Sequence, residues 1–348
     1  MPVLPPVPAA DLEHILTVAE KDFQQLQGAR IFITGGTGFF GTWLLEAIAA
    51  ANARLNTKID AVVLSRNPAA FAKRLPHLAQ NPSFSWHVGD VRTFASPSGE
   101  FSHIIHGATA ASAALNEQDP REMFTTIVHG TERVLEYALG CQTKNLLLIS
   151  SGAVYGKQPP DIPNIPETYM GAPDPSDPLS AYAEGKRAAE LLCALTPGLS
   201  SKIARCFAFI GPHLPLDAHF AAGNFLRDVL REKNIVIHGD GRPLRSYLHA
   251  SDLVIWLLAI LVRGRSNHPY NVGDEKAVSI AELARITALA GNKHPESVEI
   301  LQPPGEDPPP RYVPDTNRAK NELELTACIG LPESIKSTLS WHSFLKDA

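Results

Sequence analysis

The sequence contains few cysteines, and they are not spaced to bind a metal. Four cysteines occur among 348 residues, at widely separated positions and without a C-x-x-C pair. The thirteen histidines are also scattered, with no H-x-x-x-H grouping. Such a pattern favours reduced cysteines buried as small apolar side chains over disulfides or metal ligands. We therefore predict that the protein has no metal site.

The chain also lacks a strong charge of either sign and a long apolar segment. A net charge of −5 with no basic stripe does not match the electrostatic footprint of a nucleic-acid-binding protein. The longest apolar run, Leu253 to Val262, is too short to cross a bilayer, which takes about 20 residues. The N-terminus shows no basic region followed by an apolar core, as a secretory signal would. We expect a cytoplasmic protein with neither a nucleic-acid nor a membrane partner.

Strand-like and helix-like segments alternate from Arg30 onward. The predicted strands are apolar nearly throughout, and helix-like segments such as residues 39–50 and 118–139 separate them. Strands of this kind indicate a parallel sheet that is covered on both faces. The sequence thus predicts an α/β fold with a doubly wound parallel sheet. The expected strands are residues 30–34, 59–65, 84–88, 102–106 and 145–150.

Three regions follow from this pattern. Residues 1–28 combine a proline-rich lead with an amphipathic helix, and we expect an N-terminal helical extension that packs on the main body. Residues 29–207, with segments that return later, form the predicted sheet domain. Residues 208–348 mix short strands and helices, and we expect them to form mainly a smaller α/β lobe. The proline-dense residues 158–178 are not expected to form regular structure, because proline fixes φ and lacks an N–H donor; we expect a lid there.

A glycine-rich turn follows the first predicted strand and precedes a helix. Its sequence is TGGTGFFG, residues 34–41, with glycines spaced as G-x-x-G-x-x-G. In this context the spacing is typical of dinucleotide binding, since glycine allows a tight turn and the helix N-terminus offers N–H groups to a pyrophosphate. An ordinary glycine-rich βα turn is the alternative. The predicted cofactor contacts in this turn are Gly35, Thr37, Gly38, Phe39, Phe40 and Gly41.

The ends of the following strands are expected to bind the rest of the cofactor. An acid after the second strand would bond the ribose hydroxyl and select NAD, but Ser65 and Arg66 stand there. The Arg66 guanidinium can pair with the 2′-phosphate of NADP, or it can be a solvated loop side chain. Further along the chain, Asp90 and Val91 are predicted to lie beside the adenine, and Ala108 and Thr109 beside the nicotinamide half of the cofactor.

A serine at a strand end and a Tyr-x-x-x-Lys pair form a candidate catalytic group. Tyr182 and Lys186 lie four residues apart at the start of a helix, so both side chains project from one face. A lysine ammonium near a phenol lowers the pKa of the phenol, which would let Tyr182 act as a general base. Ser151 is expected to hold the substrate hydroxyl, and Ser150 to lie beside the cofactor. A surface pair on an amphipathic helix is the alternative, but the glycine turn and the serine in this chain order favour catalysis.

Three segments, TGGTGFFG, SSGAVYG and YAEGK, resemble the cofactor, serine and tyrosine–lysine motifs of the extended short-chain dehydrogenase/reductase family of nucleotide-sugar epimerases and dehydratases. The resemblance runs from Arg30 to the C-terminus. It implies a Rossmann-type sheet and a tightly bound cofactor, NAD or alternatively NADP, that Tyr182 and Lys186 also contact. It further implies a nucleoside-diphosphate sugar bound with the C-terminal substrate lobe, and a homodimer formed through the helices near 118–139 and 180–195.

The resemblance extends to the substrate side of the predicted site. GDGRPLRSYLHASDL is similar to the family segment in which an arginine binds the diphosphate, which implies this role for Arg245. Arg311 looks like a second diphosphate arginine, and paired guanidinium groups suit phosphate oxygens. Asn224 matches a position that often faces the nucleotide. Surface salt bridges are the alternative for both arginines.

The two residues after Ser151 bear on which reaction is catalysed. The resemblance implies an Asp-Glu pair there in 4,6-dehydratases, and an acid at the second position in uronic-acid decarboxylases. Here the two positions are Gly152 and Ala153. An epimerase acting at C4 needs only the serine, tyrosine and lysine, so the missing acids favour an epimerase. The alternatives are a dehydratase or decarboxylase with acids from Glu184 or residues 158–178, and an NADPH-dependent reductase of a 4-keto sugar.

Overall fold

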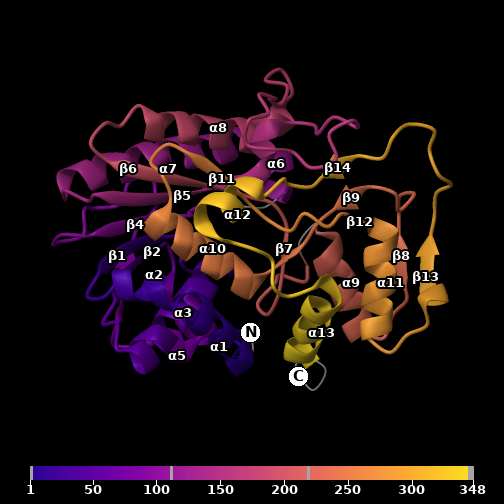
Figure 1. The fold of residues 1–348 in the computed structure, drawn as a ribbon, viewed down its shortest axis with the longest axis horizontal. Helices are drawn as coiled ribbons and strands as arrows, with labels where there is room; N and C mark the ends of the chain where they lie inside the picture. Colours follow the sequence, from indigo (N-terminus) through magenta and orange to yellow (C-terminus); the bar gives the residue numbers. More distant parts are fainter. Residues whose placement is uncertain (1–2, 110–112, 218–219, 344–348) are drawn as a thin grey trace.

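The computed structural model describes residues 3–109, 113–217 and 220–343, and its centre is a seven-stranded sheet. Every strand pair in this sheet is parallel, in the order β11-β6-β5-β4-β1-β2-β3 (Figure 1). The doubly wound, Rossmann-type parallel sheet predicted from the sequence is therefore confirmed. Its strands are β1 (Arg30–Thr34), β2 (Asp60–Ser65), β3 (Phe84–Val88), β4 (His103–His106), β5 (Asn145–Ser151), β6 (Ser200–Cys206) and β11 (Pro269–Val272).

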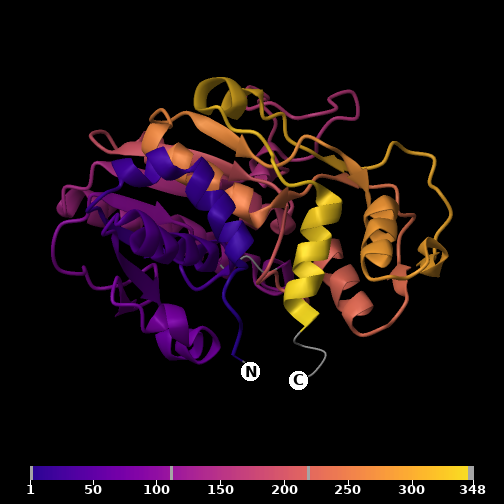
Figure 2. The same cartoon turned by 60° about the horizontal axis from the view of Figure 1, so that its bottom comes forward.

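Helices cover both faces of the sheet, as the apolar strands require. Along β1, Ile31 and Ile33 belong to one buried core, and Phe32 between them belongs to the other, because successive side chains point to opposite faces. The two helical layers are seen on either side of the sheet in Figure 1 and, turned, in Figure 2. The first layer contains α1 (Ala9–Val18), α2 (Glu20–Gln25), α3 (Phe39–Leu55) and α10 (Ala250–Arg263); the second contains α7 (Pro120–Gly140) and α8 (Ala181–Ala194).

Four short helices connect or flank these layers, and a smaller lobe follows β6. The short helices are α4 (Pro68–Arg74), α5 (Pro76–Ala79), α6 (Ala113–Gln118) and α12 (Asn317–Leu323).

The smaller lobe has its own apolar core and stands apart at the orange and yellow end of Figure 1. Its helices are α9 (Ala221–Leu230), α11 (Ile280–Ala290) and α13 (Leu331–His342). Its strands are β7 (Phe209–Ile210) with β10 (Leu248–His249), β8 (Ile235–Ile237) with β13 (Val298–Ile300), and β12 (Val278–Ser279), β9 (Leu244–Arg245) and β14 (Arg311–Tyr312) in one sheet.

Two segments from the second half of the chain return to the main sheet. β11 pairs with β6, and α10 packs in the same core as α3. The sequence analysis assigned both regions to the part of the chain that mainly forms the smaller lobe. The division at residue 207 itself stays a prediction.

The N-terminal helices pack on the main body through buried polar contacts as well as apolar ones. Asp22 accepts a hydrogen bond from Arg263 at 2.7 Å, and its side chain is almost fully buried. His14 and Asp252 are joined at 2.9 Å. The indole of Trp341, on α13, donates to the backbone oxygen of Pro6. The N-terminal segment therefore contacts both α10 and α13. Among the described residues, no helix has the length and apolar character needed to cross a membrane.

The proline-dense residues 158–178 pair with a second proline-rich segment, residues 303–315. The backbone N–H of Ile165 donates to the oxygen of Val313, and that of Asp315 donates to the oxygen of Ile165, both at 2.9 Å. The Gln158 side chain accepts from the N–H of Val313 and donates to the oxygens of residues 162 and 163. The first part of the predicted lid is thus held against the strand that carries Tyr312.

Candidate active site

The glycine-rich turn after β1 has room for backbone only. Gly35 has φ +76°, and a Cβ there would lie 2.6 Å from the backbone carbon of Gly107. A Cβ at Gly41 would collide with the backbone of Gly36. Gly38, which precedes the first residue of α3, is exposed, and a Cβ there would meet only the oxygen of Gly35, at 3.5 Å. A tight turn that ends at an accessible helix N-terminus fits the pyrophosphate of a dinucleotide.

Gly36 is a further required glycine that the sequence analysis missed. A Cβ there would lie 2.5 Å from Cγ1 of Val63, in the neighbouring strand β2. The glycine pair in TGGTG was visible in the sequence, but its contact with β2 depends on sheet pairing.

Phe40, one of the predicted cofactor contacts, packs edge-on against Phe209 with the ring centroids 5.0 Å apart. Phe39 and Phe40 are both half-buried beside the turn.

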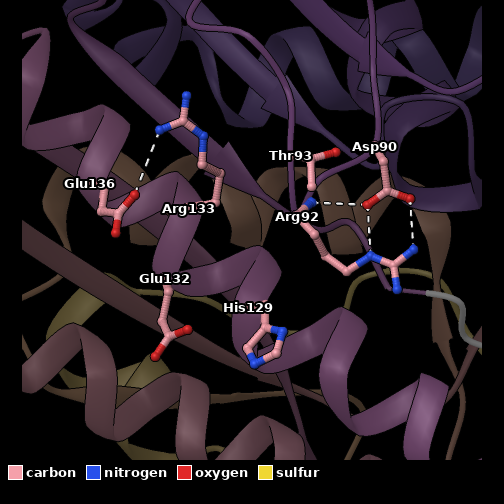
Figure 3. Close-up of a pocket in the computed structure, with 7 residues that line it drawn as sticks. All are labelled: Asp90, Arg92, Thr93, His129, Glu132, Arg133 and Glu136. Carbon is pink, nitrogen blue, oxygen red and sulfur yellow. Dashed lines mark hydrogen bonds and ion pairs between the residues drawn. The ribbon is translucent and has the colours of Figure 1, made fainter.

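The ends of β2 and β3 place two predicted cofactor residues near each other. Arg66 is exposed, and its charge helps to lower the pKa of Asp90, although the hydrogen bonds from Arg92 are the larger cause. Arg92 donates to both carboxylate oxygens of Asp90, at 2.8 and 3.0 Å (Figure 3). It also donates to Glu122 at 2.8 Å. Val91 is buried against Gly130 of α7. Asp90 is therefore held in a fixed orientation by a neighbouring guanidinium.

A polar hollow of about 570 Å³ opens beside Asp90 and Arg92. Figure 3 shows that it is lined by charged side chains of α7, among them His129, Glu132 and Arg133. None of the predicted catalytic residues lines it. The hollow is therefore not assigned to the sugar.

The end of β4 is fixed by a buried histidine. His106 Nδ1 is 2.8 Å from the Thr34 hydroxyl, and its Nε2 is 3.0 Å from the Thr131 hydroxyl. The Thr131 hydroxyl donates to a helical carbonyl, so the histidine donates through Nε2 and accepts at Nδ1. Thr34 in turn accepts from the N–H of Ala108. Burial lowers the pKa of His106 to about 3, which keeps it neutral. The chain of hydrogen bonds orients Ala108, a predicted nicotinamide contact.

Lys186, on α8, reaches the ends of β4 and β5. Its ammonium donates to the Thr109 hydroxyl and to the backbone oxygen of Ile149, both at 2.8 Å. Burial lowers the pKa of Lys186 to about 8. The ammonium is 5.9 Å from the centre of the Tyr182 ring. Lys186, Tyr182 and Thr109 are therefore brought together from two distant parts of the chain.

Tyr182 and Ser151 lie next to each other across the end of β5. The Ser151 hydroxyl accepts from the N–H of Ala153 at 3.1 Å, where the short 3-10 helix Gly152–Tyr155 begins. Burial raises the pKa of Tyr182, and a hydrogen bond with Ser151 partly offsets this. We expected Lys186 to lower this pKa. In the structure burial raises this pKa instead, and Lys186 is not among its causes.

Ser150 faces a different set of partners from Ser151. Its hydroxyl donates to Glu190 at 2.5 Å, and the same carboxylate accepts from Arg205 at 2.6 Å. Arg205 lies over the ring of Tyr155, whose hydroxyl donates to Asn271. The Ser150 side chain thus belongs to a polar network between α8, β5 and β6. A cofactor contact by Ser150 stays a prediction.

The predicted substrate residues lie in the smaller lobe. Arg245 on β9 is the register partner of Tyr312 on β14, and its guanidinium lies 5.9 Å from the centre of that ring. Arg311, the preceding residue on β14, donates to the backbone oxygen of Pro163. Since neighbouring residues of a strand point to opposite faces, the two arginines do not converge here. Asn224, on α9, accepts from Arg227 at 3.0 Å.

One group of potential metal ligands is found among the described residues, at His14, Asp252 and Cys328. Their ligand atoms lie within 4.8 Å of one another, and no ion is present. The Asp252 carboxylate already accepts from His14 and from the N–H groups of Cys328 and Ile329. These contacts tie α1, α10 and the segment before α13 together. The predicted absence of a metal site stays a prediction.

Residues 31–273 match the sequence profile of the NAD dependent epimerase/dehydratase family. The chain belongs to this family. It is thus an NAD-dependent enzyme of the group that contains nucleotide-sugar epimerases, dehydratases and decarboxylases, and the family uses NAD or NADP. The chain is 31% identical over 319 residues to UDP-glucuronic acid decarboxylase 2 of Arabidopsis thaliana, covering 89% of this chain and 68% of that protein. It is 29% identical over 335 residues to UDP-glucuronic acid decarboxylase 1 of Xenopus tropicalis, covering 95% and 74%.

Solved structures of the family share the fold. A dTDP-glucose 4,6-dehydratase from Streptomyces venezuelae, with NAD and TYD bound, is 22% identical with a TM-score of 0.78, covering 91% of this chain and 98% of that one. A UDP-glucose 4-epimerase from Thermotoga maritima, with UDP-glucose, is 21% identical with a TM-score of 0.74, covering 91% and 99%. At this identity the likeness concerns the fold, which serves several reactions.

Proposed function

We propose that this enzyme is a nucleoside-diphosphate-sugar epimerase that inverts C4 through transient oxidation to a keto sugar. Tyr182 takes the proton of the sugar hydroxyl, and Ser151 holds the reacting oxygen by donating a hydrogen bond. A nicotinamide cofactor, held by the glycine-rich turn and by the segment of Ala108 and Thr109, would supply the hydride acceptor for C4 and the hydride donor for the opposite face of the sugar. Tyr182 then gives the proton back. Lys186 contributes positive charge near the phenolate and holds the Thr109 segment in place.

The observation that carries this proposal is the lack of space beside Ser151. A Cβ at Gly152 would lie 2.7 Å from both the Tyr312 hydroxyl and Cζ of Phe207. An acid for dehydration therefore has no room at this position, and Ala153 supplies none at the next. Two acids that could replace them are engaged elsewhere. Glu184 pairs with Arg187, and the buried carboxylate of Glu167 accepts from a backbone N–H.

We propose NAD as the resident cofactor, held by the glycine-rich turn before α3, by Asp90 and Val91, and by Ala108 and Thr109. NADP is the alternative, because Arg66 is exposed at the end of β2, where a 2′-phosphate would lie. Release of the cofactor by denaturation, followed by its identification by mass, separates the two.

Arg245 is proposed to bind the diphosphate of the substrate, with Asn224 and Arg311 as further contacts. The contacts that Asn224 and Arg311 make within the protein would then have to open, and the Arg311 side chain, which lies on the opposite face of its strand, would have to turn toward Arg245.

A UDP-glucuronic acid decarboxylase is the second candidate, favoured by the relatives at about 30% identity. A sugar acid oxidised at C4 is a β-keto acid, which loses carbon dioxide readily. Decarboxylation therefore needs fewer protein groups than dehydration does. The two candidates are distinguished by the mass of the product: an epimerase leaves it unchanged, whereas a decarboxylase releases carbon dioxide.

A panel of nucleotide sugars tests the proposal. Purified enzyme would be incubated with UDP-, GDP-, CDP- and dTDP-sugars, including UDP-glucuronic acid, without added cofactor. We expect an epimer of unchanged mass from a UDP-sugar. A product lighter by carbon dioxide would establish the decarboxylase, and a product lighter by water the dehydratase. A strict requirement for NADPH would point to a reductase. Tyr182→Phe should abolish turnover while the cofactor stays bound.

We also propose a homodimer formed through α7 and α8, which lie side by side on one face of the sheet (Figure 1). Phe124, Leu139, Leu191 and Leu195 on these helices are exposed by 38 to 67%. Large apolar side chains on neighbouring helices are typical of an interface. Light scattering should give twice the mass of one chain, and Leu191→Glu should produce monomers.

A further inference from the structure

Three polar side chains form one row across three neighbouring strands of the main sheet. Ser150 on β5 is the register partner of Arg205 on β6, which in turn is the register partner of Asn271 on β11. Each is the last residue but one of its strand, so the row lies close to the carboxyl ends. Ser150 is on the same side of β5 as Leu148, which packs in one core with Ala189 of α8. The row therefore begins under α8.

One carboxylate on α8, that of Glu190, accepts from two members of the row. The Ser150 hydroxyl donates to it at 2.5 Å. The Arg205 guanidinium donates to its two oxygens, at 3.0 and 2.6 Å. The side chains of Glu190 and Arg205 are only 12% and 16% exposed. A guanidinium that donates two N–H groups to one carboxylate fixes the geometry of the pair, so the Glu190 carboxylate has little freedom to move along the sheet.

Glu190 is aligned with the predicted catalytic pair. Tyr182, Lys186 and Glu190 are spaced by four residues, so their side chains follow one face of α8. The Lys186 ammonium donates to the backbone oxygen of Ile149 at 2.8 Å. The next residue of the strand, Ser150, donates to Glu190. The helix is thus attached to the end of β5 at two points one turn apart, and these attachments set where Tyr182 lies along the sheet.

The far end of the row is anchored to the segment expected to form the lid. The Asn271 side chain donates to the backbone oxygens of Ile165 and Asp315, both at 2.9 Å. It accepts from the Tyr155 hydroxyl at 2.7 Å. The Arg205 guanidinium lies 4.8 Å from the centre of the Tyr155 ring. Arg205 is therefore held on the side away from α8 as well, and it offers the helix a partner of defined position.

We propose that Ser150 and Glu190 are positioning residues: their hydrogen bond, supported by Arg205, fixes α8 on the sheet so that Tyr182 and Lys186 reach the sugar and the cofactor. A hydroxyl has a single proton, and that of Ser150 goes to Glu190. Ser150 is accordingly assigned to the attachment of α8 and not to the cofactor. The effect on turnover rests on the proposed function, but the attachment of α8 does not.

Ser150→Ala removes the donor and leaves the pair of Glu190 and Arg205 in place. We expect kcat to fall about tenfold, because a hydrogen bond to a charged group is lost. The KM for the sugar and the affinity for the cofactor should stay unchanged, since neither binding site loses a contact.

Tyr270→Phe is the matched control for Ser150→Ala. It removes another buried hydroxyl of the same sheet that donates to a carboxylate, that of Glu322 at 2.8 Å. Both variants are expected to lower the free energy of unfolding, but Tyr270→Phe should leave kcat unchanged. A purely structural role of Ser150 would lower the stability of both variants and the kcat of neither.

Glu190→Asp keeps the negative charge beside Arg205 but shortens the side chain by one methylene group. The helix must then shift or lose one of its two donors, and a displacement of about 1 Å can lower turnover about 100-fold. We expect a larger loss of kcat than in Ser150→Ala, again with an unchanged KM. Because both changes break the same attachment, the loss in the double variant should be smaller than the product of the single losses.

The ammonium of Lys186 provides a measurement that needs no sugar. In protein labelled with ¹⁵N at the lysine Nζ atoms, its NMR signal is assigned by its loss in Lys186→Met. The signal should shift in Ser150→Ala and in Glu190→Asp, and it should keep its position in Tyr270→Phe. If Glu190→Asp does not fold, Ser150→Ala alone decides.

An unshifted Lys186 signal in Ser150→Ala, an unchanged kcat, or a loss confined to cofactor affinity would each overturn the proposal. If the panel shows decarboxylation or dehydration, kcat is measured on that reaction. A shifted Lys186 signal in an enzyme that epimerises none of the tested sugars would contradict the proposed function and leave this inference standing.

Discussion

Lys186 donates a hydrogen bond to the hydroxyl of Thr109 at 2.8 Å, and this contact joins α8 to the segment after β4. The two residues are 77 positions apart in the chain. Thr109 was expected to contact the nicotinamide half of the cofactor, and Lys186 to act with Tyr182. Their hydrogen bond couples the orientation of Lys186 to that of the segment predicted to bind the cofactor. A change at Thr109 should therefore affect turnover.

Thr109→Val should lower kcat about tenfold, because the lysine loses one of its two fixed acceptors and each tenfold change corresponds to about 1.4 kcal/mol. Thr109→Ser keeps the acceptor and is the matched control, with turnover close to that of the unaltered enzyme. Steady-state kinetics on the sugar that the panel identifies would measure both variants. Turnover in Thr109→Val that stays close to that of the unaltered enzyme would show that the hydrogen bond from Lys186 does not matter.

Lys186→Met should abolish turnover and yet increase the free energy of unfolding at pH 7. Burial lowers the folded-state pKa of Lys186 to about 8 from 10.5, so below pH 8 the charged lysine favours the unfolded chain. Methionine removes this cost, and a gain of about 1–3 kcal/mol is expected after the lost hydrogen bonds. Urea titrations at pH 7 would measure it. A less stable variant would show that the bonds to Thr109 and Ile149 outweigh the cost of burying the charge.

Acid should destabilise the protein in part through His106. Its folded-state pKa of about 3 lies below the ordinary 6.5, so its stabilising contribution is present above pH 6.5 and is lost as the pH falls from 6.5 toward 3. His106→Gln can replace its hydrogen bonds to Thr34 and Thr131 but does not titrate. The free energy of unfolding should then fall less steeply below pH 6.5, by up to about 1.4 kcal/mol per pH unit. Identical slopes would contradict the assignment.

Arg66→Ala should weaken NADP binding about tenfold or more and leave NAD binding nearly unchanged, since only NADP carries the 2′-phosphate that a guanidinium can pair with. Arg54→Ala is a suitable control, because Arg54 is exposed on α3 and pairs with Glu13. Calorimetric titration with each cofactor would compare them. If both cofactors lose affinity equally, Arg66 does not read the 2′-position.

The local sequence patterns predicted the sheet well, and long-range pairing accounts for what was missed. The apolar strands β1 to β5 were recognisable because each is short, uniform and followed by a turn or helix signal. β11 was assigned to the smaller lobe because PYNV is short and its partner β6 is far away in the sequence. Nothing local distinguishes such a strand from the others in that region.

In the candidate site, too, the residues in local motifs were predicted and those placed by long-range contacts were not. The glycine turn, Ser151, Tyr182 and Lys186 were recognised from motifs with fixed spacing. Tyr312 and His106 were not, because their positions beside the site depend on long-range hydrogen bonds. Tyr312 donates to the backbone oxygen of Cys206, 106 positions away, and His106 is joined to Thr34, 72 positions away. Neither residue carries a motif of its own.

The central claim is that C4 is oxidised and reduced within one binding event. The most direct measurement uses a UDP-sugar with deuterium at C4, incubated with the purified enzyme without added cofactor and followed by NMR and mass spectrometry. The account predicts an epimer of unchanged mass that retains the deuterium at C4. Loss of the label to solvent, or a product lighter by carbon dioxide or water, would contradict it.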